Sequence, residues 1–278
     1  MTARGAGLLV GKVALVVGAS RGIGAGIALA MADAGAQVVL AARDQAALAL
    51  RVEEITRRGG QAVAFPVDVL DEDSVKGLLA EVRRRFGRLD AAVNNAAGGG
   101  RPPALLADWS SAEFDSAVAV DLRGVFLCLK YELELMLSDG EDGGGGSGGA
   151  IVNMSSTAGE QGVSGLSGYV AGKYGVGGLT RVAALDYAGA GIRVNAIAPG
   201  PILTDRLAAA GLGAQKMAAA AVPLGRLGQV QDVAAAAVWL CSEESGFVTG
   251  TVMPVDGGRL AGVPAFNIKP NQGAPDPN

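Results

Sequence analysis

The stretch VALVVGASRGIG, residues 13–24, decides the fold of this chain. Its first five residues are apolar and mostly β-branched, a pattern typical of a strand that is buried on both faces. A glycine-rich turn follows at 18–24, and a helical pattern continues to Ala34. Backbone NH groups at the start of such a helix can approach a phosphate, because the helix dipole favours an anion there. The spacing G-x-x-x-G-x-G differs from the G-x-G-x-x-G fingerprint, so glycines that serve only a tight turn and close packing are the alternative.

The rest of the chain repeats this alternation of strand and helix. Further strands are expected at 37–42, 62–67, 89–93, 150–154, 192–197 and 251–255, and helices at 45–58, 71–86, 111–137, 232–241 and from 169 to about 188. Short links between these elements predict an α/β fold with a parallel, doubly wound sheet and helices on both faces. We therefore expect one domain spanning 1–278, with its core at 11–258.

Three segments interrupt this rhythm. Residues 138–149 consist mainly of glycine, serine and acidic residues, so a flexible, solvated loop is expected there. The proline-containing tail 264–278 is expected to be extended. In 205–222, short apolar helical pieces are broken by Gly211 and Gly213. Such glycines suggest hinges, and we interpret this segment as a lid over a substrate.

The composition argues against several classes of function. The net charge is −4 at pH 7 and no basic patch stands out, so no nucleic-acid partner is expected. The chain has no histidine, which removes histidine-based triads and most transition-metal sites, and no metal is expected. No apolar run reaches transmembrane length, and the N-terminal run is too short for a secretory signal. We expect a soluble, cytoplasmic protein without a membrane partner, in which Cys128 and Cys241 are buried free thiols.

Candidate catalytic residues gather where strands end. Tyr169 and Lys173 are four residues apart, and on a helix this spacing places both side chains on one face. Lys173 would supply a positive charge that favours the ionised phenol. Ser156 follows the strand 150–154 and Asn94 follows 89–93, so both are expected to face the crevice beyond the carboxyl ends of the strands. Alone, the Tyr–Lys spacing is common, and an ordinary pair on a helix surface is the alternative.

Two arginines bear on the choice of cofactor. Arg43 follows the second strand, where the adenine ribose of a dinucleotide would lie, and Arg21 lies in the glycine-rich turn. Two cations there favour a 2′-phosphate, and hence NADP(H) over NAD(H). The neighbouring Asp44 argues the other way, and Arg43 as a solvated loop residue is the alternative.

In order along residues 11–258, these segments resemble the short-chain dehydrogenase/reductase family. The motifs are GASRGIG at 18–24, Asp68-Val69, NNAAG at 94–98, IVNMSS at 151–156, YVAGK at 169–173, RVNAIAPGPILT at 193–204 and VTGTVMPVDGG at 248–258. The resemblance implies a single Rossmann-like domain with a seven-stranded parallel sheet. It also implies a homotetramer or homodimer built on the two long helices.

The resemblance also assigns roles to residues. It implies that Tyr169 is the general acid/base, that Lys173 binds the nicotinamide ribose and assists Tyr169, and that Ser156 binds the substrate oxygen. The implied cofactor contacts are Gly18, Ser20, Arg21, Ile23 and Gly24 in the phosphate turn, Asp68 and Val69 at the adenine, Asn94 at the nucleoside, and Pro199, Gly200, Ile202 and Thr204 on the nicotinamide side, besides Arg43, Tyr169 and Lys173.

Asp121 is the main departure from the family pattern. It stands in Val120-Asp121-Leu122-Arg123-Gly124-Val125-Phe126, where the family has a catalytic asparagine that holds a water through its main-chain carbonyl. Any residue type offers that carbonyl. Asp121 is therefore either a fourth catalytic residue with an altered proton relay or a structural aspartate within a helix. Smaller departures are Val17, where the family often has threonine, and the additional alanine in 94–98.

Together these observations predict an NADP(H)-dependent oxidoreductase that interconverts a ketone and a secondary alcohol. A 2,4-dienoyl-CoA-type or enoyl reductase is one alternative, because some dienoyl-CoA reductases of the family share the AAG element and an aspartate at the fourth position. A catalytically idle NADP(H)-binding scaffold is another. The segments 157–166 and 205–222 are mostly small or apolar, with Glu160 and Gln161 as polar exceptions and Arg206 and Lys216 as the cations, so an apolar carbonyl or alcohol substrate is expected.

Overall fold

A computed structural model describes residues 7–98, 101–138 and 148–262 of the chain. Within these residues the core is a sheet of seven parallel strands in the order β3-β2-β1-β4-β5-β6-β7. The strands are β1 (Val13–Val17), β2 (Gln37–Ala42), β3 (Gln61–Pro66), β4 (Ala91–Asn94), β5 (Gly149–Met154), β6 (Ile192–Pro199) and β7 (Val252–Val255). The predicted single, Rossmann-like domain with a seven-stranded parallel sheet is thus confirmed.

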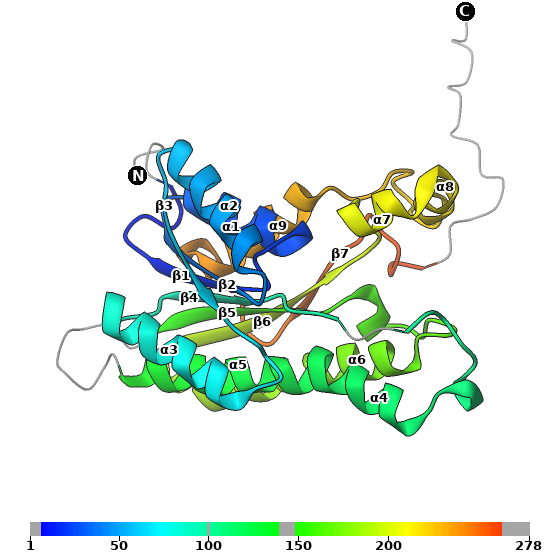
Figure 1. Ribbon diagram of the computed structural model, residues 1–278, viewed down its shortest axis with the longest axis horizontal. Coiled ribbons are helices and arrows are strands. Elements are labelled where there is room, and N and C mark those ends of the chain that lie inside the picture. Colours follow the sequence, from blue (N-terminus) through cyan, green and yellow to red (C-terminus); the bar gives the residue numbers. More distant parts are fainter. Residues whose placement is uncertain (1–6, 99–100, 139–147, 263–278) are drawn as a thin grey trace, which may run out of the picture.

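Helices cover both faces of the sheet, as expected for a doubly wound fold (Figure 1). Helices α1, α2 and α9 lie on one face, and α3, α5 and α6 on the other. The helices are α1 (Gly22–Asp33), α2 (Gln45–Arg57), α3 (Glu72–Phe86), α4 (Ser111–Val118), α5 (Gly124–Ser138), α6 (Ser167–Tyr187), α7 (Asp205–Ala209), α8 (Gly211–Ala220) and α9 (Val230–Cys241).

Strand β1 explains why the opening stretch is apolar at every position. All five of its residues are buried. Val13, Leu15 and Val17 pack into the hydrophobic cluster on the side of α3, α5 and α6. Ala14 and Val16 pack into the cluster on the side of α1, α2 and α9. A strand covered on both faces has no solvent side, so alternation with polar residues is not needed.

The segment expected as one helix at 111–137 is helical throughout, but its middle is not a regular α-helix. The π-helical turn η2 (Ala119–Arg123) separates α4 from α5, and it contains the buried Asp121. A π-helical turn accommodates one additional residue, and such turns occur frequently at functional sites. The apolar pattern of the segment reads as one helix because a single additional residue disturbs it only locally.

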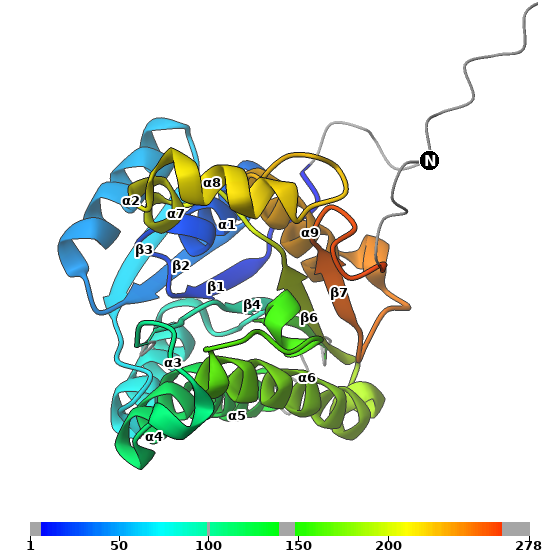
Figure 2. The ribbon, with the colours of Figure 1, turned by 90° about the vertical axis from the view of Figure 1, so that its right-hand side faces the viewer.

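The expected lid is a pair of short helices, α7 and α8, on the same side of the sheet as α1 and α9 (Figure 2). None of the residues in either helix is buried. Gly211 begins α8 with a φ of +87°, a conformation that L side chains rarely adopt. Gly213 lies inside α8, so it is not the second break that the sequence suggested.

Several smaller expectations concern the ends of elements and the cysteines. Of the loop expected at 138–149, Ser138 ends α5 and Gly149 starts β5, and residues 139–147 lie outside the described residues. The expected extended tail 264–278 also lies outside them. Cys128 and Cys241 are buried and free, as predicted. Among the helices that the structure describes, none is long and apolar enough to cross a membrane.

Candidate active site

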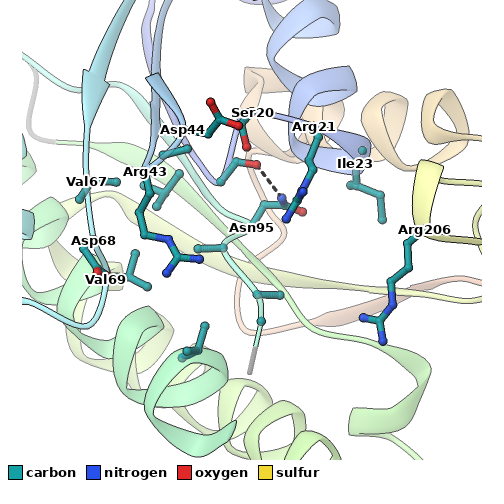
Figure 3. A pocket seen from close by; sticks show the side chains of 18 of the residues that line it. Ser20, Arg21, Ile23, Arg43, Asp44, Val67, Asp68, Val69, Asn95 and Arg206 are labelled. Atoms are coloured by element: carbon teal, nitrogen blue, oxygen red, sulfur yellow. Dashed lines mark hydrogen bonds between the residues drawn. The ribbon is translucent and has the colours of Figure 1, made fainter. Parts of the chain in front are cut away.

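A cavity of about 830 Å³ opens beyond the carboxyl ends of β1, β2 and β4 (Figure 3). It extends from the glycine-rich turn to Tyr169 and to the start of α7. The predicted site residues that line it are Gly18, Ser20, Arg21, Ile23, Arg43, Asp68, Val69, Tyr169 and Thr204. The sequence therefore identified residues from five separate segments that meet at one cavity.

The glycine-rich turn is shaped by contacts that exclude side chains. Gly18 has a φ of +83°, and a Cβ there would lie 2.7 Å from the backbone nitrogen of Ala96. A Cβ on Gly24 would lie 2.2 Å from the carbonyl oxygen of Gly18. The side chain of Asn95 donates a hydrogen bond of 3.1 Å to the same carbonyl. The turn is thus held close to the 95–96 segment, and its backbone stays uncovered at the cavity.

Helix α1 starts at this turn without a capping side chain. Its N-cap residue is Arg21, which makes no side-chain capping hydrogen bond, and its first turn contains no acidic residue. By contrast, Asp44 caps α2 and Asp71 caps α3. An uncapped helix start, next to glycines where no Cβ has room, fits the phosphates of a dinucleotide. Free NH groups and the helix dipole both favour an anion there.

Three arginines surround the cavity, namely Arg21, Arg43 and Arg206 (Figure 3). Within residues 7–98, 101–138 and 148–262, none of the three forms a salt bridge. Asp44 also lines the cavity, but its carboxylate accepts a hydrogen bond of 3.0 Å from the backbone NH of Ala47 at the start of α2. Asp68 and Asp205 also line the cavity, so what distinguishes the three guanidinium groups is that none of them is paired with a carboxylate in the described part of the chain.

The side of the cavity beyond β3 is formed by Asp68 and Val69, as the resemblance implied. Asp68 is fixed in place because its carboxylate accepts a hydrogen bond of 3.0 Å from the NH of Leu70. Its own backbone NH donates to Ser74 at 3.1 Å. The adenine contact assigned to these two residues stays a prediction, and their position agrees with it.

Tyr169 and Lys173 lie together on α6, as their spacing predicted. The ammonium of Lys173 lies 5.7 Å from the centroid of the Tyr169 ring. Tyr169 lines the cavity, whereas Lys173 is only 2% exposed. The Lys173 ammonium donates a hydrogen bond of 3.0 Å to the carbonyl of Met154 at the end of β5. The phenol thus borders the cavity, and the positive charge lies behind it in the protein interior.

Asp121 approaches this pair directly. Its carboxylate oxygen Oδ1 lies 3.6 Å from the Lys173 ammonium, and both side chains are 2% exposed. Burial raises the pKa of Asp121, while the charge of Lys173 and the backbone of Gly98 act in the opposite direction. Gly172 makes the approach possible, since a Cβ there would lie 3.0 Å from the Cβ of Asp121. The sequence assigned a main-chain role to Asp121 and gave no sign of this side-chain pairing.

Ser156 lies at the end of β5 but is not among the residues that line the cavity. Its hydroxyl accepts a hydrogen bond of 3.1 Å from the NH of Ala158, which caps the short helix η3 (Thr157–Gly159). The hydroxyl can still donate its own proton, because a serine oxygen both donates and accepts. A contact between Ser156 and a substrate stays a prediction.

Other predicted cofactor residues do not reach the cavity with their side chains. Asn94 is buried and donates to Glu132 and Asn153, away from the glycine-rich turn. Ile202 is 7% exposed and packs in the hydrophobic core. The backbone NH of Gly200 donates a hydrogen bond of 3.0 Å to the carbonyl of Val255. The remaining predicted residues, Gly24 and Pro199, shape the turn and end β6 without lining the cavity.

The structure adds lining residues that the sequence reasoning did not assign. Asn95 takes the place expected for Asn94, because side chains of consecutive residues at the end of a strand point to opposite sides. That alternation was a usable signal. Ser116 and Val120 line the cavity from the α4–η2 segment, and these two depend on tertiary packing that the sequence does not display. Arg206 reaches the cavity from α7, within the segment 205–222 that was expected to lie over the substrate (Figure 3).

Comparisons with known proteins agree with this geometry. Residues 18–259 match the family model described as enoyl-(acyl carrier protein) reductase. The chain is 42% identical over 257 residues to an A-factor type gamma-butyrolactone 1′-reductase (1S-forming) of Streptomyces virginiae, covering 91% of this chain and 96% of that one. It is 41% identical over 254 residues to a cis-4-hydroxycyclohexanecarboxylate dehydrogenase of Sinomonas cyclohexanicum, covering 90% and 97%.

A solved structure is similar over nearly the whole chain. It is a putative NAD(P)-dependent gluconate 5-dehydrogenase from Beutenbergia cavernae with bound NADP at low occupancy. The TM-score is 0.83 at 33% sequence identity, and the match covers 91% of this chain and 98% of that chain.

Proposed function

This chain belongs to the short-chain dehydrogenase/reductase family and is an oxidoreductase, and from that premise we propose that it interconverts a ketone and a secondary alcohol with NADP(H). The observation that carries the proposal is the arrangement of Tyr169, whose phenol borders the cavity while the buried Lys173 lies behind its ring. This places one proton-carrying group beside the space for a substrate and a positive charge where water does not reach.

When bound, the nicotinamide supplies the hydride for reduction and accepts it in oxidation. Tyr169 donates its proton to the carbonyl oxygen as the carbon–oxygen double bond becomes an alcohol, and takes the proton back in the reverse direction. The positive charge of Lys173 favours the phenolate left after donation. The Met154 carbonyl holds the Lys173 ammonium in place at 3.0 Å.

Asp121 acts on Lys173 rather than on the substrate in this proposal. The carboxylate oxygen, 3.6 Å from the ammonium, offsets part of its charge. Since burial raises the pKa of Asp121, this carboxylate takes up a proton more readily than an exposed aspartate would. Asp121 therefore couples the Tyr169–Lys173 pair to pH.

The preference for NADP(H) rests on the charge around the cavity. Arg21 and Arg43 line it without a salt bridge in the described part of the chain, and a 2′-phosphate would pair with either guanidinium. The carboxylate of Asp44 already accepts a hydrogen bond at the start of α2. The bound NADP in the structural relative supports the same choice.

The cofactor preference is tested by replacing Arg43 with alanine. The Arg43→Ala variant should bind NADPH at least about tenfold more weakly, with NADH binding unchanged, because only NADPH carries the 2′-phosphate. The exposed Arg57→Ala variant, at the end of α2, is the matched control. Equal losses for the two cofactors would contradict the assignment.

Two relatives act on cyclic or carboxylate-bearing compounds according to their names, and Arg206 provides a cation at the substrate end of the cavity. We therefore propose that the substrate is an apolar ring or chain that carries a ketone or a secondary alcohol. The proposed class includes such compounds that also carry a carboxylate group. Loss of activity toward the carboxylates alone in Arg206→Gln would assign this arginine to their recognition.

A second candidate function is reduction of an activated carbon–carbon double bond in an enoyl or dienoyl thioester. The description of the matched family model and the aspartate at position 121 favour it. The two candidates predict different products. A saturated thioester with its carbonyl intact supports this candidate, whereas an alcohol supports the first.

The deciding experiment is a panel of ketones, alcohols and enoyl thioesters, assayed by the absorbance of NADPH and by product analysis. The Tyr169→Phe variant should lose about 10²-fold or more in kcat, as expected when a positioned acid/base is removed. Tyr174→Phe, at a half-exposed tyrosine on the same helix, should keep full activity. Unchanged turnover in Tyr169→Phe would refute the mechanism.

A further inference from the structure

A second polar cluster lies outside the cavity, between β4, β5, α5 and α6. It consists of Asn94, Glu132, Asn153 and Thr180, each no more than 2% exposed. The Asn94 amide donates to Glu132 Oε2 at 2.9 Å and to Asn153 Oδ1 at 3.0 Å. The Asn153 amide donates to the Thr180 hydroxyl at 3.0 Å, which donates to the Val176 carbonyl at 2.8 Å. These bonds form one continuous chain across four elements.

Two oxygen atoms in this hydrogen-bond chain lack a hydrogen-bond partner. They are Glu132 Oε1 and Asn94 Oδ1, both buried. A buried carboxylate that is only partly hydrogen-bonded is costly, and such a group tends to take up a proton instead. Burial raises the pKa of Glu132 to about 7, although the hydrogen bond from Asn94 acts to lower it.

The surroundings of Glu132 contain little charge. Cys128, one turn earlier on α5, is buried, and burial together with the charge of Glu132 raises the pKa of its thiol. The side chain of β4 that bonds Glu132 is the neutral Asn94, and the hydrogen-bond chain continues through the neutral side chains Asn153 of β5 and Thr180 of α6. A change in the protonation of Glu132 is therefore felt first by the Asn94 amide.

The hydrogen-bond chain can run in either direction. When Glu132 is ionised, the NH₂ group of Asn94 donates to Glu132 and Asn153, and the NH₂ group of Asn153 donates to Thr180. With neutral Glu132, the carboxyl can donate to Asn94, if the amides of Asn94 and Asn153 exchange their nitrogen and oxygen positions. Nitrogen and oxygen of an amide occupy nearly equivalent places. The Thr180 hydroxyl then donates to Asn153 instead of Val176, so one proton sets the direction of the whole chain.

The hydrogen-bond chain is connected to the active site at two points. Asn153 directly precedes Met154, whose carbonyl accepts the hydrogen bond from Lys173. Thr180 lies seven residues after Lys173 on α6, two turns along the same face. The Ser155 hydroxyl additionally donates to the Lys173 carbonyl at 3.2 Å. A reorientation of the Asn153 side chain is thus transmitted to Met154, which holds the Lys173 ammonium. A reorientation of the Thr180 side chain is transmitted to α6, which carries Lys173.

We propose that Glu132 is a positioning residue for the Tyr169–Lys173 pair, and that it works as a neutral carboxylic acid whose proton, through Asn94 and Asn153, sets the place of the Met154 carbonyl. The inference rests on the proposed function only for its kinetic readout. Ionisation of Glu132 reverses the chain and loosens the anchor of Lys173. The active site therefore responds to a proton that never enters the cavity.

The test compares Glu132→Gln and Glu132→Leu with Glu134→Gln, an exposed glutamate on the same helix. Infrared spectra of the protein without substrate should contain a protonated-carboxyl band that fades near pH 7, about the pKa of Glu132. Glu132→Gln should lack this band and Glu134→Gln should keep it. Glu132→Leu should lower kcat about tenfold with a smaller change in KM, the size typical of coupling through packed networks.

The pH profile separates positioning from a purely structural role. In Glu132→Gln, kcat should be close to wild type but without the inflection near the Glu132 pKa, because glutamine keeps the hydrogen bonds and has no proton to lose. If no substrate of the panel turns over, the dissociation constant of NADPH, followed by fluorescence, replaces kcat, since Lys173 is expected to contact the ribose. An unchanged carboxyl band in Glu132→Gln, or a pH profile that coincides with that of the wild type, would overturn the proposal.

Discussion

Replacing Glu132 with glutamine should remove a defined part of the pH dependence of stability. The folded protein holds the Glu132 proton up to a pKa of about 7, against the ordinary value of 4.5. Between these values the folded state binds a proton that the unfolded chain releases. The free energy of unfolding therefore falls as the pH rises through this window, which is the sign expected for an acid with a raised pKa.

The size of the effect follows from the same two values. Their difference of about 2.5, at about 1.4 kcal/mol for each pKa unit, gives about 3 kcal/mol. The wild type should lose about this much stability from Glu132 between about pH 4.5 and about pH 8. In Glu132→Gln this contribution is absent, so the variant should gain about 3 kcal/mol relative to the wild type across the interval.

Urea unfolding at a series of pH values, at one fixed protein concentration, measures this difference. Asp121 also has a pKa raised by burial, but it is present in both proteins and cancels in the comparison. Glu134→Gln, an exposed glutamate on the same helix, should parallel the wild type. If the wild type and Glu132→Gln gave parallel curves, the buried carboxyl would not be the titrating group, and the reasoning would fail.

Three further predictions concern the turn, the charge pair and the assembly. Gly24→Ala should weaken NADPH binding by about tenfold or more in a fluorescence titration, because its Cβ would lie 2.2 Å from the Gly18 carbonyl oxygen at the phosphate turn; binding of wild-type strength would contradict the assigned turn. Asp121→Asn should flatten the acidic side of the kcat/KM profile, since burial raises the pKa of Asp121 and asparagine gains no proton beside Lys173; an unaltered acidic side would refute the coupling. Leu185, 82% exposed on α6, should lie in a contact between subunits, so Leu185→Glu should shift the protein to a smaller species in analytical ultracentrifugation, and an unchanged mass would oppose assembly through this helix.

Most of the fold could be predicted because burial leaves a direct mark on the sequence. Strand β1 is apolar at five consecutive positions, since helices cover both of its faces. The glycines at 18 and 24 are required by contacts of 2.7 and 2.2 Å that any Cβ would make. The Tyr169–Lys173 pair was predictable because helical periodicity alone brings residues four apart together.

The parts that could not be predicted depend on contacts between distant segments. Asp121, which pairs with Lys173, lies in the π-helical turn η2, and helical periodicity does not reveal one additional residue in a turn. Asn94 and Asn95 are chemically identical, and although alternation at the strand end separates their two sides, which side meets the cavity depends on the packing around β4. The segment 205–222 was expected to lie over the substrate, but only the packing of α7 decides that Arg206, and not Lys216, lines the cavity.

The π-helical turn η2 also lets α4 and α5 keep one common alignment although the chain between them holds an additional residue. One residue corresponds to about 100° of rotation along an α-helix, and the wider turn takes up that rotation locally. Deleting a single residue from Ala119–Arg123 would let α4 and α5 merge into one regular helix, with Ser116 still at the cavity wall. The backbone around Asp121 would tighten, and the 3.6 Å approach of its carboxylate to Lys173 would change. The additional residue thus acts on the charge pair behind Tyr169 and leaves the wall of the cavity in place.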